Sequence, residues 1–193
     1  MEHLLKGLLD LSRLDSGTVE VKFQRIPLQA LLESITSHEA ETARHKGLHL
    51  RIRPTSAVAM SDPTLLQQIL RNLVGNAVHH TQHGGVLVTV RRHKARLLIQ
   101  VWDTGGGIAP HNVDRIFDEF VQLGNPAREG SQGLGLGLSI VKRAARLLDH
   151  PIRLRSTLGH GSCFSVELPA APLHAAPPPL VTPVQPGVTD GFS

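Results

Sequence analysis

Cysteine and aromatic residues are scarce in this chain. Its 193 residues include one cysteine, Cys163, which excludes an internal disulfide and fits a reducing compartment. Aromatic residues make up 3% of the chain and tyrosine is absent, so the core must be mostly aliphatic. No apolar run reaches membrane-spanning length and no signal peptide opens the sequence. We therefore expect a soluble cytoplasmic domain, or the cytoplasmic part of a larger protein, without direct membrane contact.

A long run of one charge is also lacking. Lysine and arginine exceed aspartate and glutamate by 20 to 16, which gives a formal net charge of +4. The densest basic cluster, residues 91–94, is short enough to be the solvated end of a hairpin. Nucleic acid is therefore not indicated as a partner.

The two ends of the chain differ from its middle. In residues 2–14, leucines at helical spacing predict a short helix that is too apolar on one side to stand alone in water. We expect it to pack on a partner helix, in this chain or in a second copy that would form a homodimer. An ordinary N-terminal core helix remains the alternative. Residues 170–193 are rich in proline and alanine and predict an extended linker or tail.

Hydrophobic periodicity predicts helices and strands between these ends. Helices are expected over residues 28–46, 63–80, 110–120 and 138–149. Strands are expected over residues 18–26, 48–53, 57–60, 86–93 and 96–102, with a final hairpin turning at 159–161. Residues 121–132 have little apolar content and predict a loop, and its position before a glycine-rich segment suggests a lid.

A line of polar side chains borders the apolar stripe of the helix expected over residues 63–80. Asn72 and Asn76 stand four residues apart and share a face, and His79 and His80 follow three and four residues later. Asparagine is a poor helix former, so two of them aligned beside two histidines suggest a binding site. A polar rim facing solvent would explain the same pattern.

Asp103 stands at the end of an expected strand and is followed by the glycines of the segment DTGGGI, residues 103–108. A carboxylate there can accept a hydrogen bond, while the glycines let a ligand lie close to the backbone. An ordinary Asp–Gly turn without a ligand remains the alternative.

The segment QGLGLGLSIVKRAARLL, residues 132–148, runs from a glycine-rich strip directly into an amphipathic helix. Glycines permit a close backbone approach, and the first N–H groups and the dipole of a helix both favour anions. This pattern indicates a phosphate site. Glycine-rich turns before helices also serve packing, so the strip by itself does not decide between the two uses.

Taken together, five segments resemble the motifs of the ATP-binding catalytic domain of bacterial sensor histidine kinases, within the wider superfamily of gyrase, HSP90-like and MutL-type ATPases. LLQQILRNLVGNAVHHT resembles the N box, DTGGGI the first G box and RIFDEF the F box. GLGLGLSIVKR resembles the second G box and GHGSCFSVELP the terminal strand motif. The resemblance covers nearly all of residues 1–169. It implies an α/β two-layer sandwich of the Bergerat type, with a mixed, mostly antiparallel sheet of about five strands backed by three helices and an N-terminal helical remnant.

The resemblance assigns roles within the N box. It implies that the side-chain oxygen of Asn76 holds Mg²⁺ against the triphosphate of ATP, with Asn72 beside it. His79 occupies the position of a basic residue near the phosphates, so His79 and Asn72 would be the catalytic residues. His80 replaces the aromatic ring that often stacks on adenine, which implies a modest affinity.

The resemblance also implies contacts to the base and to the phosphates. Asp103 would accept a hydrogen bond from the adenine amino group, Gly105 and Gly107 would let the base approach, Ile108 would line the pocket, and Ser162 would lie at the adenine edge. The backbone N–H groups of the glycine strip would close on the phosphates; its residues are Gly133, Leu134, Gly135, Leu136, Gly137 and Leu138. Leu134 stands where threonine or serine is common, which removes one phosphate contact.

The function implied is a histidine kinase catalytic domain that donates the γ-phosphate of ATP to a histidine on a separate dimerisation domain in two-component signalling. No phosphoacceptor motif is present, since His3 is followed by LLKG, so the chain alone is expected not to autophosphorylate. Residues 1–16 would be the end of a dimerisation helix, 17–169 the ATP-binding domain and 170–193 a linker toward a receiver domain, as in hybrid kinases. An ATPase related to gyrase and a non-catalytic nucleotide-binding module remain alternatives, although Asn72 stands where those ATPases carry a glutamate base.

Overall fold

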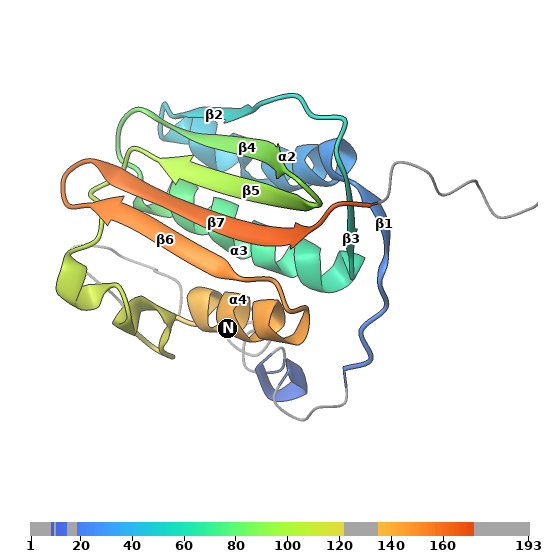
Figure 1. Cartoon of the computed structure of the whole chain (residues 1–193). Helices are drawn as coiled ribbons and strands as arrows, with labels where there is room; N and C mark the ends of the chain where they lie inside the picture. Colours follow the sequence, from blue (N-terminus) through green and yellow to red (C-terminus); the bar gives the residue numbers. More distant parts are fainter. Residues whose placement is uncertain (1–8, 10, 15–18, 122–134, 172–193) are drawn as a thin grey trace, which may run out of the picture.

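The computed structural model describes residues 9, 11–14, 19–121 and 135–171. Its centre is a five-stranded sheet (Figure 1). The strand order across the sheet is β2 (His49–Ile52), β4 (Gly85–His93), β5 (Arg96–Asp103), β7 (Gly161–Pro169) and β6 (Ile152–Thr157). β2 pairs with β4 in parallel and the other pairs are antiparallel. The predicted mixed, mostly antiparallel sheet is thereby confirmed.

Three helices form the second layer, on one face of the sheet: α2 (Leu28–His45), α3 (Pro63–His80) and α4 (Gly137–Leu147) (Figure 1). The predicted two-layer sandwich with three helices is therefore confirmed as well. None of the helices in the described part of the chain combines the length and the apolar composition that a membrane crossing requires.

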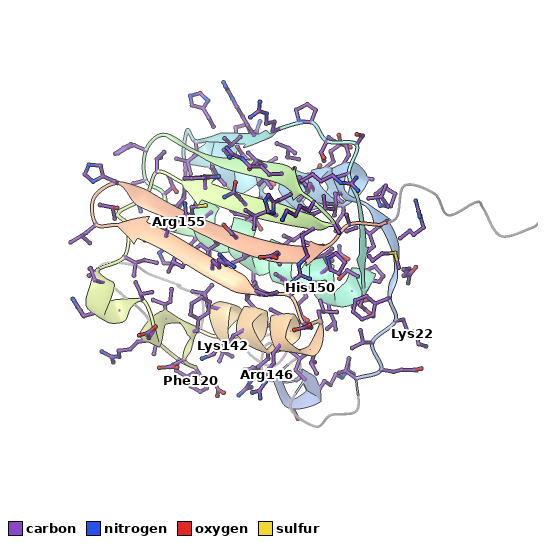
Figure 2. The ribbon with its side chains drawn as sticks, viewed as in Figure 1. Lys22, Phe120, Lys142, Arg146, His150 and Arg155 are labelled. Atoms are coloured by element: carbon purple, nitrogen blue, oxygen red, sulfur yellow. The ribbon has the colours of Figure 1, made fainter. Side chains whose placement is uncertain are left out.

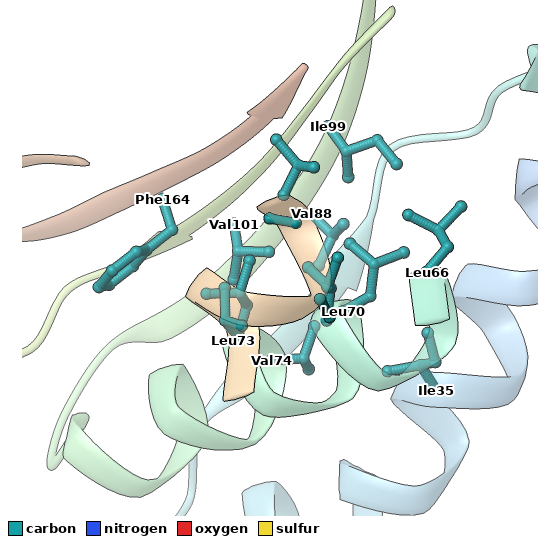
Figure 3. Packing of buried hydrophobic residues seen from close by; sticks show 14 of the residues in the cluster. Ile35, Leu66, Leu70, Leu73, Val74, Val88, Ile99, Val101 and Phe164 are labelled. Atoms are coloured by element: carbon teal, nitrogen blue, oxygen red, sulfur yellow. The ribbon is translucent and has the colours of Figure 1, made fainter. Parts of the chain in front are cut away.

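α3 begins where its sequence predicts. The side chain of Asp62 accepts hydrogen bonds from the backbone N–H groups of Thr64 and Leu65, both at 3.0 Å, and Pro63 occupies the first turn, where no N–H is needed. Its apolar stripe packs against the sheet, as Figure 3 shows for Leu70 and Val88 among others. Burying one such side chain stabilises the fold by about 2 kcal/mol, so this helix is a rigid support for whatever its polar edge carries.

The strand expected over residues 18–26 is shorter than predicted. β1 (Gln24–Pro27) pairs antiparallel with β3 (Val58–Ser61), and these two strands form a separate ribbon. Because β3 has four residues, the chain before Gln24 has no strand partner, and the N–H of Lys22 donates instead to Oδ2 of Asp62 at 2.9 Å. Phe23, just before this strand, is 50% exposed.

The prediction of a single helix over residues 110–120 is wrong. The structure has two 3₁₀ turns, η1 (Pro110–Asn112) and η2 (Arg115–Phe117). Only Ile116 of this segment is buried, and Phe120, at φ 61°, is 60% exposed. A helix is maintained by burial of one continuous face, and here the chain turns at Phe120 to meet Gly135, whose carbonyl accepts the Phe120 N–H at 3.2 Å.

The two ends of the described chain both join the folded domain. Leu11 and Leu14 are buried in the core formed by this same chain, which agrees with packing of the first helix within the chain. The backbone N–H groups of Ala170 and Ala171 donate to Ala95 and Val58 at 2.9 and 2.8 Å. Residues 170 and 171 are therefore hydrogen-bonded to the folded domain. Residues 172–193 lie outside the described residues.

Candidate functional site

The amide side chains of the N box meet the start of α4. A Cβ placed on Gly137 would lie 2.9 Å from Oδ1 of Asn72 and 3.6 Å from Nδ2 of Asn76, so the backbone of Gly137 lies close to both amides. Among the residues that the structure describes, no side chain caps the N-terminus of α4, and the first N–H groups of a helix have no partner inside it. Two amides and the positive end of a helix dipole therefore converge on one place, which suits an anion together with a hard cation.

Asp103 ends β5 on the helix-covered side of the sheet. Its Oδ1 accepts the backbone N–H groups of Gly105 at 2.9 Å and of Ser162 at 3.1 Å. Burial raises the pKa of the Asp103 carboxyl, and these two N–H groups and the nearby His80 oppose the rise. With Oδ1 held by the backbone, Oδ2 is the oxygen left to accept a hydrogen bond from a ligand.

The glycines after Asp103 are required by the protein backbone itself. A Cβ on Gly105 would lie 2.6 Å from the carbonyl oxygen of His80 at the end of α3. Gly107, at φ 68°, packs directly against the carbonyl of Thr157 in the β6–β7 hairpin. The loop is thus held between α3 and the hairpin, close to Asp103. Ile108 is partly buried against the core beside it.

The end of α3 carries His79 and His80, both exposed, with perpendicular rings whose centroids are 5.0 Å apart. The ammonium of Lys46 donates to the carbonyl oxygens of Val78 at 3.1 Å and His79 at 2.6 Å. It thereby satisfies two carbonyls that the helix end leaves without partners. The sequence analysis did not single out Lys46, because nothing in the sequence indicates that the end of α2 lies beside the end of α3.

Ser156 is a second residue that the sequence analysis missed. Its Oγ lies 2.8 Å from the backbone N of Ile108 and 2.9 Å from Oγ of Ser162. It joins the loop after Asp103 to the strand that carries Ser162. Its position opposite Ser162 across the expected hairpin was a usable signal.

The glycine strip is described only in part. Gly133, Leu134 and the lid expected at 121–132 lie outside the described residues, except for Val121. Leu136 is buried in the core and Leu138 is partly buried against it, so the strip is attached to the domain through its leucines. Figure 2 shows the side chain of Phe120, near the strip, at the outer edge of the molecule.

Comparison with known proteins identifies the family of this chain. The model of the histidine kinase-, DNA gyrase B-, and HSP90-like ATPase family matches residues 61–172. The sensor histidine kinase RcsC of Escherichia coli (strain K12) is 34% identical over 169 residues, which cover 86% of this chain and 18% of that protein. The sensor histidine kinase MtrB of Mycolicibacterium paratuberculosis is 30% identical over 197 residues, which cover 100% of this chain and 35% of that protein. The chain thus spans only a small part of the length of these relatives.

Solved structures show the same fold. Full-length ShkA in complex with AMPPNP is 32% identical, with a TM-score of 0.78, over 89% of this chain and 36% of that one. The Acinetobacter baumannii histidine kinase AdeS, at 20% identity and a TM-score of 0.73, covers 87% of this chain and 77% of its own and supports the fold alone. The chain therefore belongs to the histidine kinase-, DNA gyrase B- and HSP90-like ATPase family, as an ATP-binding domain of the sensor histidine kinase type.

Proposed function

We propose that this chain binds Mg²⁺-ATP between α3, the loop after Asp103 and the start of α4, and presents the γ-phosphate to a histidine on a dimerisation domain. The observation that carries the proposal is the meeting of Asn72 and Asn76 with Gly137 beside the second half of α3, while Asp103 lies near His80 at the C-terminal end of this helix. Asn76 and His80 are four residues apart on α3, which is about 6 Å along a helix. The site therefore has a phosphate end beside Asn72 and Asn76 and a base end beside His80 and Asp103.

The phosphate end contains Asn72, Asn76, His79 and the first turn of α4. Asn76 would hold Mg²⁺ through its side-chain oxygen, a ligand type that this ion accepts, and the ion would neutralise charge on the phosphates. Nδ2 of Asn72 donates to the carbonyl of Gln68 at 2.8 Å, which directs its Oδ1 toward the start of α4. An amide so placed orients a ligand but is not a base, so activation of water, and hence hydrolysis, would be slow.

The base end contains Asp103, Gly105, Gly107, Ile108 and Ser162. Oδ2 of Asp103 would accept the adenine amino group, and the exposed ring of His80 would lie against the base. These contacts would position the nucleotide, and positioning together with charge neutralisation is most of what phosphoryl transfer requires.

The partners follow from the relatives, which are sensor histidine kinases. We propose a histidine-bearing dimerisation domain as the phosphate acceptor, a receiver domain as the next partner in a two-component system, and a cytoplasmic location. Homodimerisation through the first helix would have to use surface other than Leu11 and Leu14, which are buried within one chain.

The experiment that tests nucleotide binding is calorimetric titration of Mg²⁺-ATP into Asn76→Ala. The metal contact should be lost, so affinity should fall at least tenfold in Mg²⁺ and change little in EDTA. Gln67→Ala is the matched control, because nine helical residues place Gln67 about 180° from Asn76 on α3. Wild-type affinity for Mg²⁺-ATP in Asn76→Ala would refute the metal role.

Phosphotransfer is tested separately, with labelled ATP. The chain incubated alone should show no label on its twelve histidines. Mixed with a separately produced dimerisation domain from a related sensor kinase, it should produce an acid-labile phosphohistidine on that domain. Label on the chain itself would contradict the proposed division of roles.

A further inference from the structure

We propose that Ser156 makes the site selective for adenine by fixing the direction of the hydroxyl proton of Ser162. The inference rests on the proposed nucleotide site and concerns which base that site accepts. It follows from counting the protons and lone pairs around one hydroxyl group.

Ser156 on β6 lies directly opposite Ser162 on β7 in the strand register. Its Oγ has three polar neighbours: the backbone N of Ile108 at 2.8 Å, the carbonyl oxygen of Gly161 at 3.0 Å and Oγ of Ser162 at 2.9 Å. A serine hydroxyl has one proton to donate and two lone pairs with which to accept. Three neighbours therefore use its whole capacity.

The direction of each bond is then determined. The N–H of Ile108 can only donate, so it takes one lone pair of Ser156. The carbonyl of Gly161 can only accept, so it takes the single proton of Ser156. The one capacity that remains on Ser156 is a lone pair, and Ser162 must donate its own proton to it.

Ser162 consequently offers only lone pairs to a ligand. The neighbouring Asp103 has the same polarity, because Oδ1 already accepts two backbone N–H groups and Oδ2 is a further acceptor. Both groups at the base end accept hydrogen bonds and neither donates one. At the 6-position adenine presents an amino donor, whereas guanine and hypoxanthine present a carbonyl acceptor, so acceptor groups that face this position favour adenine.

The test uses Ser156→Ala in the full chain, titrated with Mg²⁺-ATP and with Mg²⁺-ITP, the inosine nucleotide that carries a carbonyl at the 6-position. Wild type should prefer ATP. Without its fixed acceptor, the Ser162 proton can turn toward the carbonyl of ITP, so the preference for ATP should fall about tenfold, the size of one hydrogen bond. Ser156→Thr keeps the hydroxyl and should keep the preference.

Ser165→Ala is the matched control, since Ser165 lies on the same strand as Ser162 but on the opposite face of the sheet, where its Oγ accepts from Nε2 of Gln100 at 3.5 Å. An unchanged ATP-to-ITP ratio in Ser156→Ala, or an equal loss in Ser165→Ala, would overturn the inference. Should Ser156→Ala fail to fold by circular dichroism, Ser162→Ala decides: the preference for ATP should fall, with Asp103 left as an acceptor, and an undiminished preference overturns the inference. Wild type that binds ATP but prefers ITP contradicts this inference alone, whereas wild type that binds neither nucleotide contradicts the proposed function itself.

Discussion

The base end and the phosphate end of the nucleotide site are held in different ways. At the base end, Asp103, Ser156 and Ser162 are joined by hydrogen bonds across β5, β6 and β7, at distances of 2.8 to 3.1 Å. At the phosphate end, and within the described ranges, Asn76 makes no side-chain hydrogen bond and no side chain caps α4. The difference suggests that the protein forms its base contacts in advance and leaves its phosphate contacts to be completed by the ligand.

The largest expected effect concerns the backbone packing at the base end. In Gly107→Ala, the alanine would have to adopt the positive φ of this position, and its Cβ would clash with the carbonyl of Thr157. We therefore expect a loss of about 3 kcal/mol in the free energy of unfolding. Gly106→Ala is the matched control, because nothing lies within 4 Å of its Cβ position, and its effect should stay within about 0.5 kcal/mol. Urea denaturation measures both, and equal stabilities would show that the base end is not preformed.

An intermediate effect is expected from Asp103→Asn. The amide replaces a carboxylate that accepts hydrogen bonds through both oxygens, so affinity for ATP should fall about thirtyfold. Affinity for inorganic triphosphate, which uses only the phosphate end, should not change. Fluorescence competition binding compares the two ligands; an equal loss for both would mean that the two ends are not independent.

A smaller effect is expected away from both ends, at His150. This side chain is buried after α4, with Nε2 2.8 Å from Oγ of Ser61, and Figure 2 shows it beside α4. Burial lowers the pKa of His150, and Arg96 lowers it further, while the backbone carbonyl and the charge of Asp149 oppose the shift. The unfolded chain therefore binds the proton more tightly, and stability should fall as pH drops below about 6.5, by at most about 1.4 kcal/mol per pH unit.

The measurement is urea denaturation between pH 8 and pH 5. His150→Phe should flatten the pH dependence in this window. His160→Phe is the control, because His160 is exposed in the turn between β6 and β7. If the stability of His150→Phe still falls at low pH, the pH dependence arises from another histidine. Neither substitution should change the ratio of the affinity for ATP to the affinity for inorganic triphosphate.

The sequence predicted well wherever local periodicity and burial agree. The helix expected over residues 63–80 and the hairpin strands expected over 86–93 and 96–102 are found nearly as predicted, because the apolar residues on one face of each element enter one core. The strand expected over 18–26 is shorter than predicted, because its partner β3 has only four residues. The helix expected over 110–120 is replaced by two 3₁₀ turns, because the chain turns at Phe120. In those segments tertiary contacts decide the conformation.

The candidate site, too, was predictable from the sequence only in part. By itself, the sequence determined which residue types the site would contain, because amides at helical spacing, a carboxylate at a strand end and a glycine strip before a helix each indicate a chemistry. Only the tertiary structure decided that Lys46 closes the end of α3 and that Ser156 faces Ser162 beside Ile108. The physical reason is that a hydrogen bond depends on distances between atoms far apart in the chain, and residue spacing along the sequence does not contain those distances.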